Sequence, residues 1–488
     1  MVQFSDAKNG SKTCSFNKKY LHSVYNPENE AKNFVSTIKS TFTPSCIIII
    51  EPALSYCAPF LRECFPNSTL AAIRILSKEF SFTDYLWDKI IDFSSLQNFS
   101  ETLFNIFGEE TLLSTLFYSW KPSESVFSFE CGEIWKGIKS AVKKGRDVLA
   151  TRSYFSRRWL INSVKFCSQT QNLFTLKKIQ KDILIAASGP SLHESLHFIK
   201  EKRQEFYLIA VSSAANVLIS KNITPDLILS CDGGYWAKKH IEFSKSENLF
   251  FALTDEAASP TKLLQSGKIV PLSYEDSIGS EILKSLGINF IFAKRNGTVS
   301  GTALEFALAL TDKKVYFSGL DLCPSKSMQH TEPNLLEKIN SNHDKRLKTK
   351  ETRQTYARFS SEGSLALYRS WFKSIPSVKA DRVFRLSDSF KYDYDLLPIK
   401  DIFWSQVNFS SSKKSSLPQK QERKKITQSE LFNKIKEILK SDKTNTELFP
   451  LENILIKRTI DDEQKKIIQA EKDKKKQELI LKIERILF

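Results

Sequence analysis

A regular series of short apolar runs between residues 183 and 317 constrains the fold of this 488-residue chain more than any other feature. Most of the runs are separated by segments long enough for a helix. They are Ile183–Ile185, Tyr207–Val211, Leu227–Leu229, Phe250–Leu253, Ile288–Phe292 and Val315–Phe317. Strands that are apolar on both faces and alternate with helices form βαβ units with right-handed crossovers. The pattern therefore predicts an α/β fold whose central, Rossmann-like sheet is mostly parallel, with helices on both faces.

The chain on either side of this region predicts two further parts. Residues 1–145 contain a strand-like run, Cys46–Ile50, after a helix-like segment, Glu28–Lys39, which together indicate a smaller N-terminal α/β domain. We place the central domain at residues 146–380. A linker and a helical C-terminal region are expected over residues 381–488.

The C-terminal region is basic. The Ser- and Lys-rich segment 410–416 is typical of a linker, and helices are predicted at Gln428–Lys440 and Leu451–Phe488. From residue 411 onward, 20 Lys and Arg stand against 13 acidic residues, and the whole chain has a net charge of +17. Acidic residues are interspersed and no known nucleic-acid motif is present. The lysine run at 472–476 therefore indicates a solvated or partner-docking helix face, and no nucleic-acid partner is expected.

Composition excludes several classes of protein. With 41% hydrophobic residues the chain can bury a core, which excludes wholesale disorder. The eight cysteines form no CxxC pair, so they predict free thiols in a reducing compartment, without a disulfide framework or zinc site. The most apolar run, Cys46–Ile50, is followed by Glu51 and is far shorter than the ~20 residues of a membrane helix. With no signal peptide visible, we expect a cytoplasmic protein without a membrane span.

The glycines indicate where a ligand would bind. Nine of the 15 glycines lie between residues 189 and 319, several directly after predicted strands, where the ligand crevice of an open α/β sheet forms. Ser188, Gly189 and Pro190 follow the first of these strands. Ser191 and Glu194 then match the S-x-x-E capping box. A helix N-terminus at this place suits a phosphate, although a capped turn without a ligand explains the same residues.

Later strands end in similar motifs. Asp232 precedes two glycines and could bind a ribose hydroxyl, a base or a metal, or cap a local turn. Ser300 and Gly301 open a helix of small residues, which suits either an anion or tight packing on the sheet. Gly319 and Asp321 end a further strand on the crevice side. His330 follows in a predicted loop, and a lone histidine there is a candidate base.

Taken in order, these motifs resemble those of the motility-associated-factor (Maf) flagellin glycosyltransferases. The central region of that family is similar to the bacterial sialyltransferases that use CMP-sialic acid. The resemblance implies a transferase that moves a nonulosonic acid, or a related sugar, from a CMP-activated donor to Ser or Thr of flagellin, supporting flagellar assembly and motility. It rests on Ile183–Leu192, Pro225–Asp232, Ser300–Gly301, Phe317–Asp321 and His330, and upstream on Leu21–Ala31.

The resemblance also implies roles for individual residues. His330 and Asp232 are the candidate catalytic residues, with His330 as the general base. No metal and no cofactor are expected, because helix N-termini at Ser191 and Ser300 would stabilise the leaving phosphate. The nucleotide sugar is then a substrate, and flagellin is the acceptor. The residues implied for the cytidine monophosphate site are Ser188, Gly189, Pro190, Ser191, Ser212, Asp232, Ser300, Gly301, Gly319 and Asp321.

Two other functions stay open. A pterin pyrophosphokinase-like enzyme would use ATP and Mg²⁺, with Asp232 and Asp321 as metal ligands. A non-catalytic flagellin-binding assembly factor would bind no nucleotide in the crevice.

Overall fold

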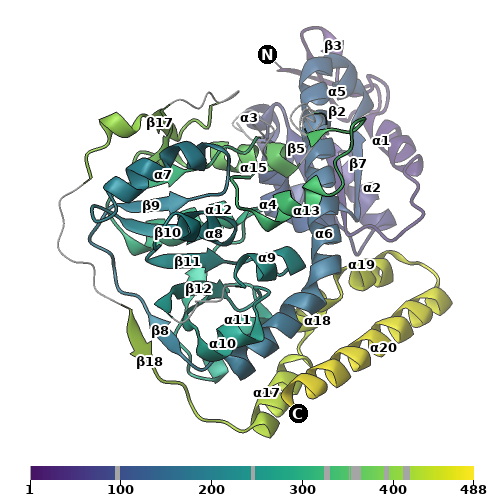
Figure 1. Cartoon of the computed structure of the whole chain (residues 1–488). Helices are drawn as coiled ribbons and strands as arrows, with labels where there is room; N and C mark the ends of the chain where they lie inside the picture. Colours follow the sequence, from purple (N-terminus) through teal and green to yellow (C-terminus); the bar gives the residue numbers. More distant parts are fainter. Residues whose placement is uncertain are drawn as a thin grey trace. The chain divides into compact units, whose positions relative to one another are not determined.

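The computed structural model describes residues 2–93, 99–242, 248–323, 330–350, 352, 364–388, 395–409 and 418–488. The chain forms two compact units (Figure 1), one of Met1–Ser156 with Asp442–Leu479 and the other of Arg157–Ser441 with Ile480–Phe488. The predicted linker at 410–416 lies outside the described residues. No described helix combines the length and the apolar character that crossing a bilayer requires.

The first unit contains the predicted N-terminal α/β architecture. Its four-stranded sheet is parallel and has the order β6-β5-β4-β7. A separate antiparallel sheet, β1-β2-β3, precedes it. The strands are β1 (Val2–Asp6), β2 (Lys12–Phe16), β3 (Lys19–Tyr20), β4 (Cys46–Ile50), β5 (Thr69–Arg74), β6 (Lys89–Asp92) and β7 (Thr115–Ser119). The helices are α1 (Pro27–Ser36), α2 (Cys57–Cys64), α3 (Ser77–Phe80), the 3₁₀ helix η1 (Ser81–Leu86), α4 (Phe99–Leu112), α5 (Lys121–Val126) and the first part of α6 (Ser128–Gln169).

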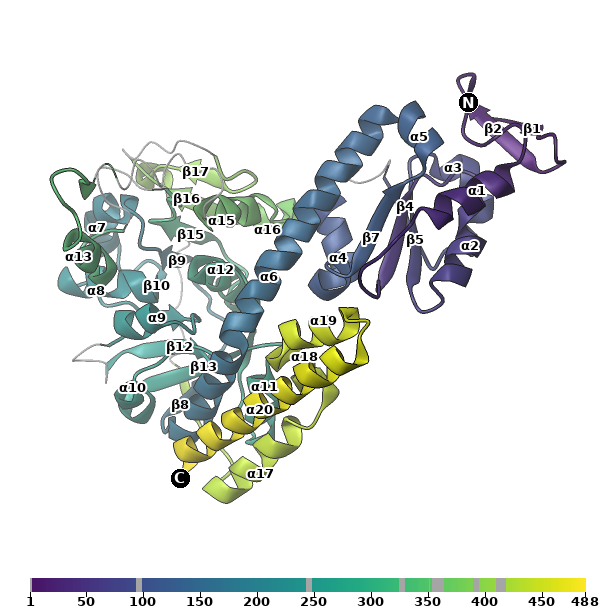
Figure 2. The same cartoon turned by 90° about the vertical axis from the view of Figure 1, so that its right-hand side faces the viewer.

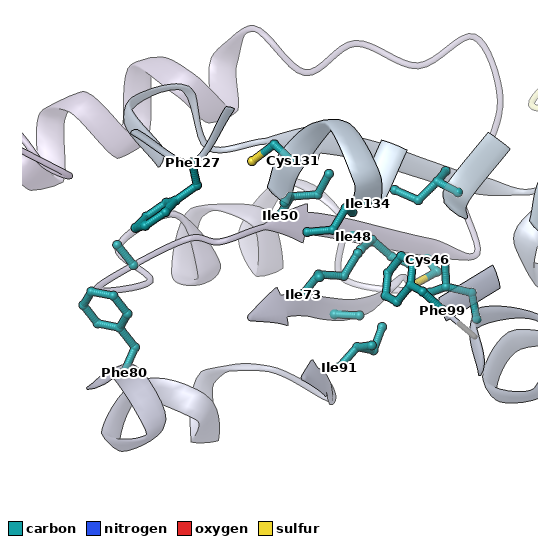
Figure 3. Packing of buried hydrophobic residues seen from close by; sticks show 14 of the residues in the cluster. Cys46, Ile48, Ile50, Ile73, Phe80, Ile91, Phe99, Phe127, Cys131 and Ile134 are labelled. Carbon is teal, nitrogen blue, oxygen red and sulfur yellow. The ribbon is translucent and has the colours of Figure 1, made fainter. Parts of the chain in front are cut away.

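Strand β4 is the centre of this unit's core, and all five of its residues are buried. Ile48 and Ile50 pack with Ile73, Phe99 and other apolar side chains on one face of the sheet (Figure 3). Ile47 and Ile49 pack in a second cluster. A parallel strand covered on both faces needs such an uninterrupted apolar run, which is why the sequence predicted β4 correctly.

A buried ion pair lies where β4 and β5 end. The side chains of Glu51 and Arg74 are both 0% exposed, and their charged groups are 3.4 Å apart. The Arg74 guanidinium also donates to the carbonyl oxygen of Ala53 at 2.8 Å. Glu51 Oε2 accepts the backbone N–H groups of Ile75 and Leu76 at 2.7 and 2.8 Å. The chain thus places a fully hydrogen-bonded carboxylate of its own at the carboxyl edge of the sheet.

The C-terminal region is helical, as predicted, but its last segment is two helices. The prediction of one helix over Leu451–Phe488 is wrong, because the Asp461 carboxylate accepts the N–H groups of Glu463 and Gln464 and so caps a new helix. Lys472 and Lys475 bond to Asn453 and Glu452, so part of the lysine run stabilises the helical packing. The helices are α17 (Gln428–Ile438), α18 (Asp442–Leu448), α19 (Pro450–Arg458) and α20 (Asp462–Leu487).

The second unit contains the predicted Rossmann-like sheet. The described residues form eleven strands with the order β17-β16-β15-β9-β10-β11-β12-β13-β8-β18, and β14 pairs with β13. Only the pairing of β18 with β8 is antiparallel among the described strands of this sheet. The strands are β8 (Leu173–Thr175), β9 (Ile183–Ala186), β10 (Tyr207–Val211), β11 (Leu227–Ser230), β12 (Phe250–Thr254), β13 (Lys268–Tyr274), β14 (Ile291–Ala293), β15 (Val315–Ser318), β16 (Val383–Leu386), β17 (Lys400–Ile402) and β18 (Gln419–Gln421).

Helices cover this sheet on both faces, which confirms the predicted layers. Figure 2 shows α7 and α8 on one face of the central strands and α12 on the other. Besides the second part of α6, the helices are α7 (Ser191–Glu201), α8 (Ser212–Ser220), α9 (Tyr235–His240), α10 (Thr261–Ser266), α11 (Ile278–Ser285), α12 (Val299–Leu310), α13 (Leu335–Ser341), α15 (Ser364–Lys373) and α16 (Ser377–Ala380).

The strand order fixes where a ligand can bind. From β9 the chain adds β10 to β13 on one side, and then returns to place β15 on the other side of β9. Ligands of open α/β sheets bind outside the carboxyl ends of the strands at such a reversal. A ligand is therefore expected at the reversal between β9 and β15.

Candidate functional site

The turns that follow β9 and β15 touch each other. The backbone N–H of Gly189 donates to the carbonyl oxygen of Gly319 at 2.9 Å. A Cβ on either glycine would collide with backbone of the other turn, and Gly319 has a φ of +79°. Only glycine combines this φ with so close an approach at low cost. The two predicted glycines therefore permit the backbone geometry of the site.

Asp321 occupies the N-terminus of α7. Its Oδ2 accepts the backbone N–H of Ser191 at 2.6 Å, and its Oδ1 accepts the Ser191 hydroxyl. The predicted capping box of Ser191 with Glu194 is wrong, because Pro190 is the N-cap and makes no side-chain cap bond. The anion at this helix end is thus a carboxylate from another strand, although the sequence suggested room for a phosphate there.

We expect Asp321→Ala to lower the free energy of unfolding by about 2–4 kcal/mol, because it leaves two buried groups of Ser191 without an acceptor. Asp321→Asn keeps one acceptor oxygen and should cost less.

Burial raises the pKa of Asp321 from 3.8 to about 6, against the opposing effect of its bonds to Ser191. The stability that Asp321 adds is thus lost as the pH rises through about 6, so the Asn variant should gain on wild type there. Urea unfolding of wild type and both variants at pH 4 to 8 tests these predictions. Equal stability of Asp321→Ala and Asp321→Asn would contradict the first, and a constant difference between Asp321→Asn and wild type across this pH range would contradict the second.

The segment that carries His330 is tied to the Ser188–Gly189 turn. The N–H of Thr331 donates to the Ser188 carbonyl at 2.8 Å, and the Thr331 hydroxyl donates to the Gly189 carbonyl at 2.5 Å. On the other side, the Ser213 hydroxyl donates to the Ser188 hydroxyl at 2.9 Å. The neighbouring Ser212, which was the predicted ligand residue, is buried at the start of α8. These bonds bring His330 to the reversal between β9 and β15.

His330 is held by a buried carboxylate. Glu337 Oε1 lies 3.1 Å from the backbone nitrogen of His330 and 3.3 Å from its Nδ1. The Glu337 side chain is 0% exposed and that of His330 is 23% exposed. Burial raises the pKa of Glu337, but its bonds with His330 outweigh that effect and leave the pKa below its usual value. Glu337 is therefore an ionised partner for the imidazole.

Asp232 lies on the same edge of the sheet, after β11. Its side chain is exposed, and its Oδ1 accepts the N–H of Gly234 at 2.8 Å. Helix α9 follows and is in contact with α13, which carries Glu337. His240 is the last residue of α9, and its burial lowers the pKa of the imidazole. The charge of His330 lowers this pKa further, whereas the charge of Asp232 raises it. His240 therefore lies within electrostatic range of both predicted catalytic residues, which its place on a helix did not suggest.

Ser300 and Gly301 lie at the N-terminus of α12, on the sheet's other face. The N-cap Thr298 accepts the Ser300 N–H at 3.3 Å, and a Cβ on Gly301 would press on Trp371. Arg295 anchors the preceding loop: its guanidinium forms two 2.7 Å bonds with Glu256 and lies over the Tyr274 ring. The N-terminus of α12 thus packs closely against Trp371, and the Arg295–Glu256 ion pair fixes the loop that precedes it.

The structure therefore brings Ser188, Gly189, Pro190, Ser191, Gly319, Asp321 and His330 together at the reversal, with Asp232 further along the edge. Glu337, Thr331 and Ser213 are the partners that sequence reasoning missed. An available signal was the Asn334-x-x-Glu337 pattern of a helix start, since Asn334 does cap α13. In the part of the chain that is described, no three His, Cys, Asp or Glu residues are grouped to hold a metal ion.

Comparison with solved structures identifies the fold. The chain is similar to a Maf glycosyltransferase from Magnetospirillum magneticum AMB-1, with a TM-score of 0.58 and 12% sequence identity. The match covers 99% of this chain and 92% of that structure. At this identity the likeness is one of fold, and it confirms at that level the resemblance drawn from the sequence motifs.

Two sequence comparisons cover the central region. A family model described as "6-hydroxymethylpterin diphosphokinase MptE-like" matches residues 157–327. An uncharacterized protein of Treponema pallidum (strain Nichols) is 31% identical over 286 residues, which is 58% of this chain. The match spans 63% of that protein's length.

Proposed function

We propose that the chain is a glycosyltransferase that moves a nonulosonic acid or a related sugar from a CMP-activated donor to Ser or Thr of flagellin in the cytoplasm. The observation that carries the proposal is the placement of His330 beside the Ser188–Gly189 turn at the reversal of the sheet. The fold of a Maf glycosyltransferase over nearly the whole chain supports it.

The donor would lie across the carboxyl ends of β9, β10 and β11. Transfer from such a donor has an oxocarbenium-like transition state, and negative charge builds on the departing phosphate. In this proposal the N-terminus of α12, at Ser300 and Gly301, would stabilise that charge through the helix dipole and without a metal, because the N–H groups of both residues already donate to Thr298. The N-terminus of α7 is less suited than we predicted, because Asp321 already accepts from Ser191. Asp232 would bind the nucleoside or the sugar.

His330 would act as the general base on the acceptor hydroxyl. The new bond forms between the acceptor oxygen and the anomeric carbon, while the bond from that carbon to the phosphate oxygen breaks. The electron pair leaves with cytidine monophosphate, and the acceptor proton goes to the imidazole. No cofactor enters this scheme, and the nucleotide sugar is consumed as a substrate.

A second function has an observation in its favour. The family model that matches residues 157–327 is described as a pterin diphosphokinase-like family. Such an enzyme would bind ATP with Mg²⁺ through Asp232 and Asp321. Both carboxylate oxygens of Asp321 already accept from Ser191, which makes this residue a poor metal ligand.

Calorimetric titration of the full chain with CMP, and separately with ATP and Mg²⁺, tests these functions. We expect CMP to bind and Asp232→Ala to weaken its binding. Incubation with a CMP-activated nonulosonic acid and flagellin should then add the mass of the sugar to flagellin. Binding of ATP and Mg²⁺ without CMP would favour the diphosphokinase. Binding of neither nucleotide, with flagellin still bound, would favour the assembly factor.

A further inference from the structure

The contacts of His330 define which of its two ring nitrogens carries the proton. Nδ1 lies 3.3 Å from Glu337 Oε1, and the same oxygen accepts the backbone N–H of His330. An ionised carboxylate can only accept hydrogen bonds, so a neutral imidazole facing it carries its hydrogen on Nδ1. Nε2 then holds the lone pair, and the structure gives it no hydrogen-bond partner among the described residues.

The carboxylate itself is fixed in place. Glu337 lies in the first turn of α13, where Asn334 Oδ1 accepts the N–H groups of Leu336 and Glu337 at 2.9 and 3.4 Å. Thr331 anchors the other end of the segment to the Ser188–Gly189 turn. His330 is therefore held between a capped helix and the Ser188–Gly189 turn at the reversal of the sheet.

We propose that Glu337 is a positioning residue that holds His330 as the Nδ1–H tautomer and so presents Nε2 to the acceptor hydroxyl. The inference rests on the proposed function for the identity of the acceptor. When Nε2 takes the acceptor proton, the imidazolium remains hydrogen-bonded to the Glu337 carboxylate, which stabilises the new positive charge. Glu337 itself exchanges no proton and touches no substrate.

Nitrogen NMR of the full chain labelled with ¹⁵N-histidine tests the tautomer, with the His330 signals assigned by their loss in His330→Ala. In wild type, Nδ1 should resonate as a protonated nitrogen and Nε2 as one with a lone pair. In Glu337→Gln the amide can donate as well as accept, so both tautomers should appear. Glu332→Gln is the matched control, because Glu332 lies in the same segment, is exposed and pairs with Lys350. It should leave the wild-type spectrum unchanged.

Transfer kinetics supply the second measurement. Glu337→Gln should lower kcat by about tenfold or more while the KM for the donor stays the same, since the tautomer and not the binding is altered. A wild-type spectrum with the proton on Nε2 would overturn the proposal by itself, even if the variant did not fold. An unchanged tautomer and kcat in a folded Glu337→Gln would also overturn it. A wild type that transfers no sugar would instead count against the proposed function, and the tautomer would still be read from the spectrum.

Discussion

Replacing His330 by Ala is expected to lower kcat for sugar transfer by a factor of about 10²–10⁴, the usual contribution of a positioned general base. The physical reason is that the acceptor hydroxyl would lose the group that takes its proton as the new bond forms. The KM for the donor should change little, because the Ser188–Gly189 turn and Asp232 remain in place. Release of cytidine monophosphate, followed in time with flagellin as acceptor, measures both constants.

His343→Ala is the matched control for this experiment. His343 follows His330 in the same part of the chain, but its side chain is exposed and it belongs to no cluster of the site. Calorimetry should show that both variants still bind CMP. Transfer by His330→Ala at the wild-type rate would show that His330 is not the general base. His240 would then be the next candidate for that role.

Replacing Arg74 by Met should lower the free energy of unfolding by about 3–5 kcal/mol, because it leaves the Glu51 carboxylate buried without its positive partner. Both side chains are 0% exposed, so water cannot take the place of the guanidinium. Methionine has a similar length and is apolar, so the variant removes the charge together with the hydrogen bonds that Arg74 donates to Ala53, Ser55 and Thr83. Thermal unfolding followed by circular dichroism measures it.

The exposed ion pair of Arg62 with Asp88 provides the control for Arg74. Both of these side chains are 42% exposed, so Arg62→Met should cost no more than about 1 kcal/mol. The double variant Glu51→Gln/Arg74→Met should regain part of the loss, since it no longer buries an unpaired charge. Equal losses for the two arginines would show that burial does not determine the strength of the Arg74 pair.

The sequence predicted those strands that are apolar on both faces. Tyr207–Val211 and Cys46–Ile50 are strands with the predicted bounds, because a strand buried between helices must be apolar throughout. Strand β13 was missed because Gly267 and Pro271 both argue against a strand. It is nevertheless an internal strand between β12 and β8, and Pro271 is in register with Leu253 of β12.

The glycines and polar residues of the site were predictable one by one, because each follows a strand. Their partners were not. Ser191 and Asp321 are 130 residues apart in the chain, and the local match of Ser191 with Glu194 offered a complete but wrong explanation of the helix start. Glu337 is seven residues from His330, and no periodic pattern relates a loop residue to the first turn of the next helix. Hydrogen bonds between separate loops are set by the tertiary fold.

The carboxylate of Glu51 bears on which of the two sheets can bind a nucleotide. The N-terminal sheet has a topology that often serves nucleotides, and its chain also reverses, between β4 and β7. There, however, Glu51 already accepts the backbone N–H groups of Ile75 and Leu76, which a phosphate would need as donors. A phosphate at this edge would also be repelled by the like charge of the carboxylate. The position at this sheet edge that a phosphate would occupy is thus filled by the chain's own carboxylate. We therefore expect the isolated edge of this sheet to bind no phosphate, so that a nucleotide would bind to the second unit alone.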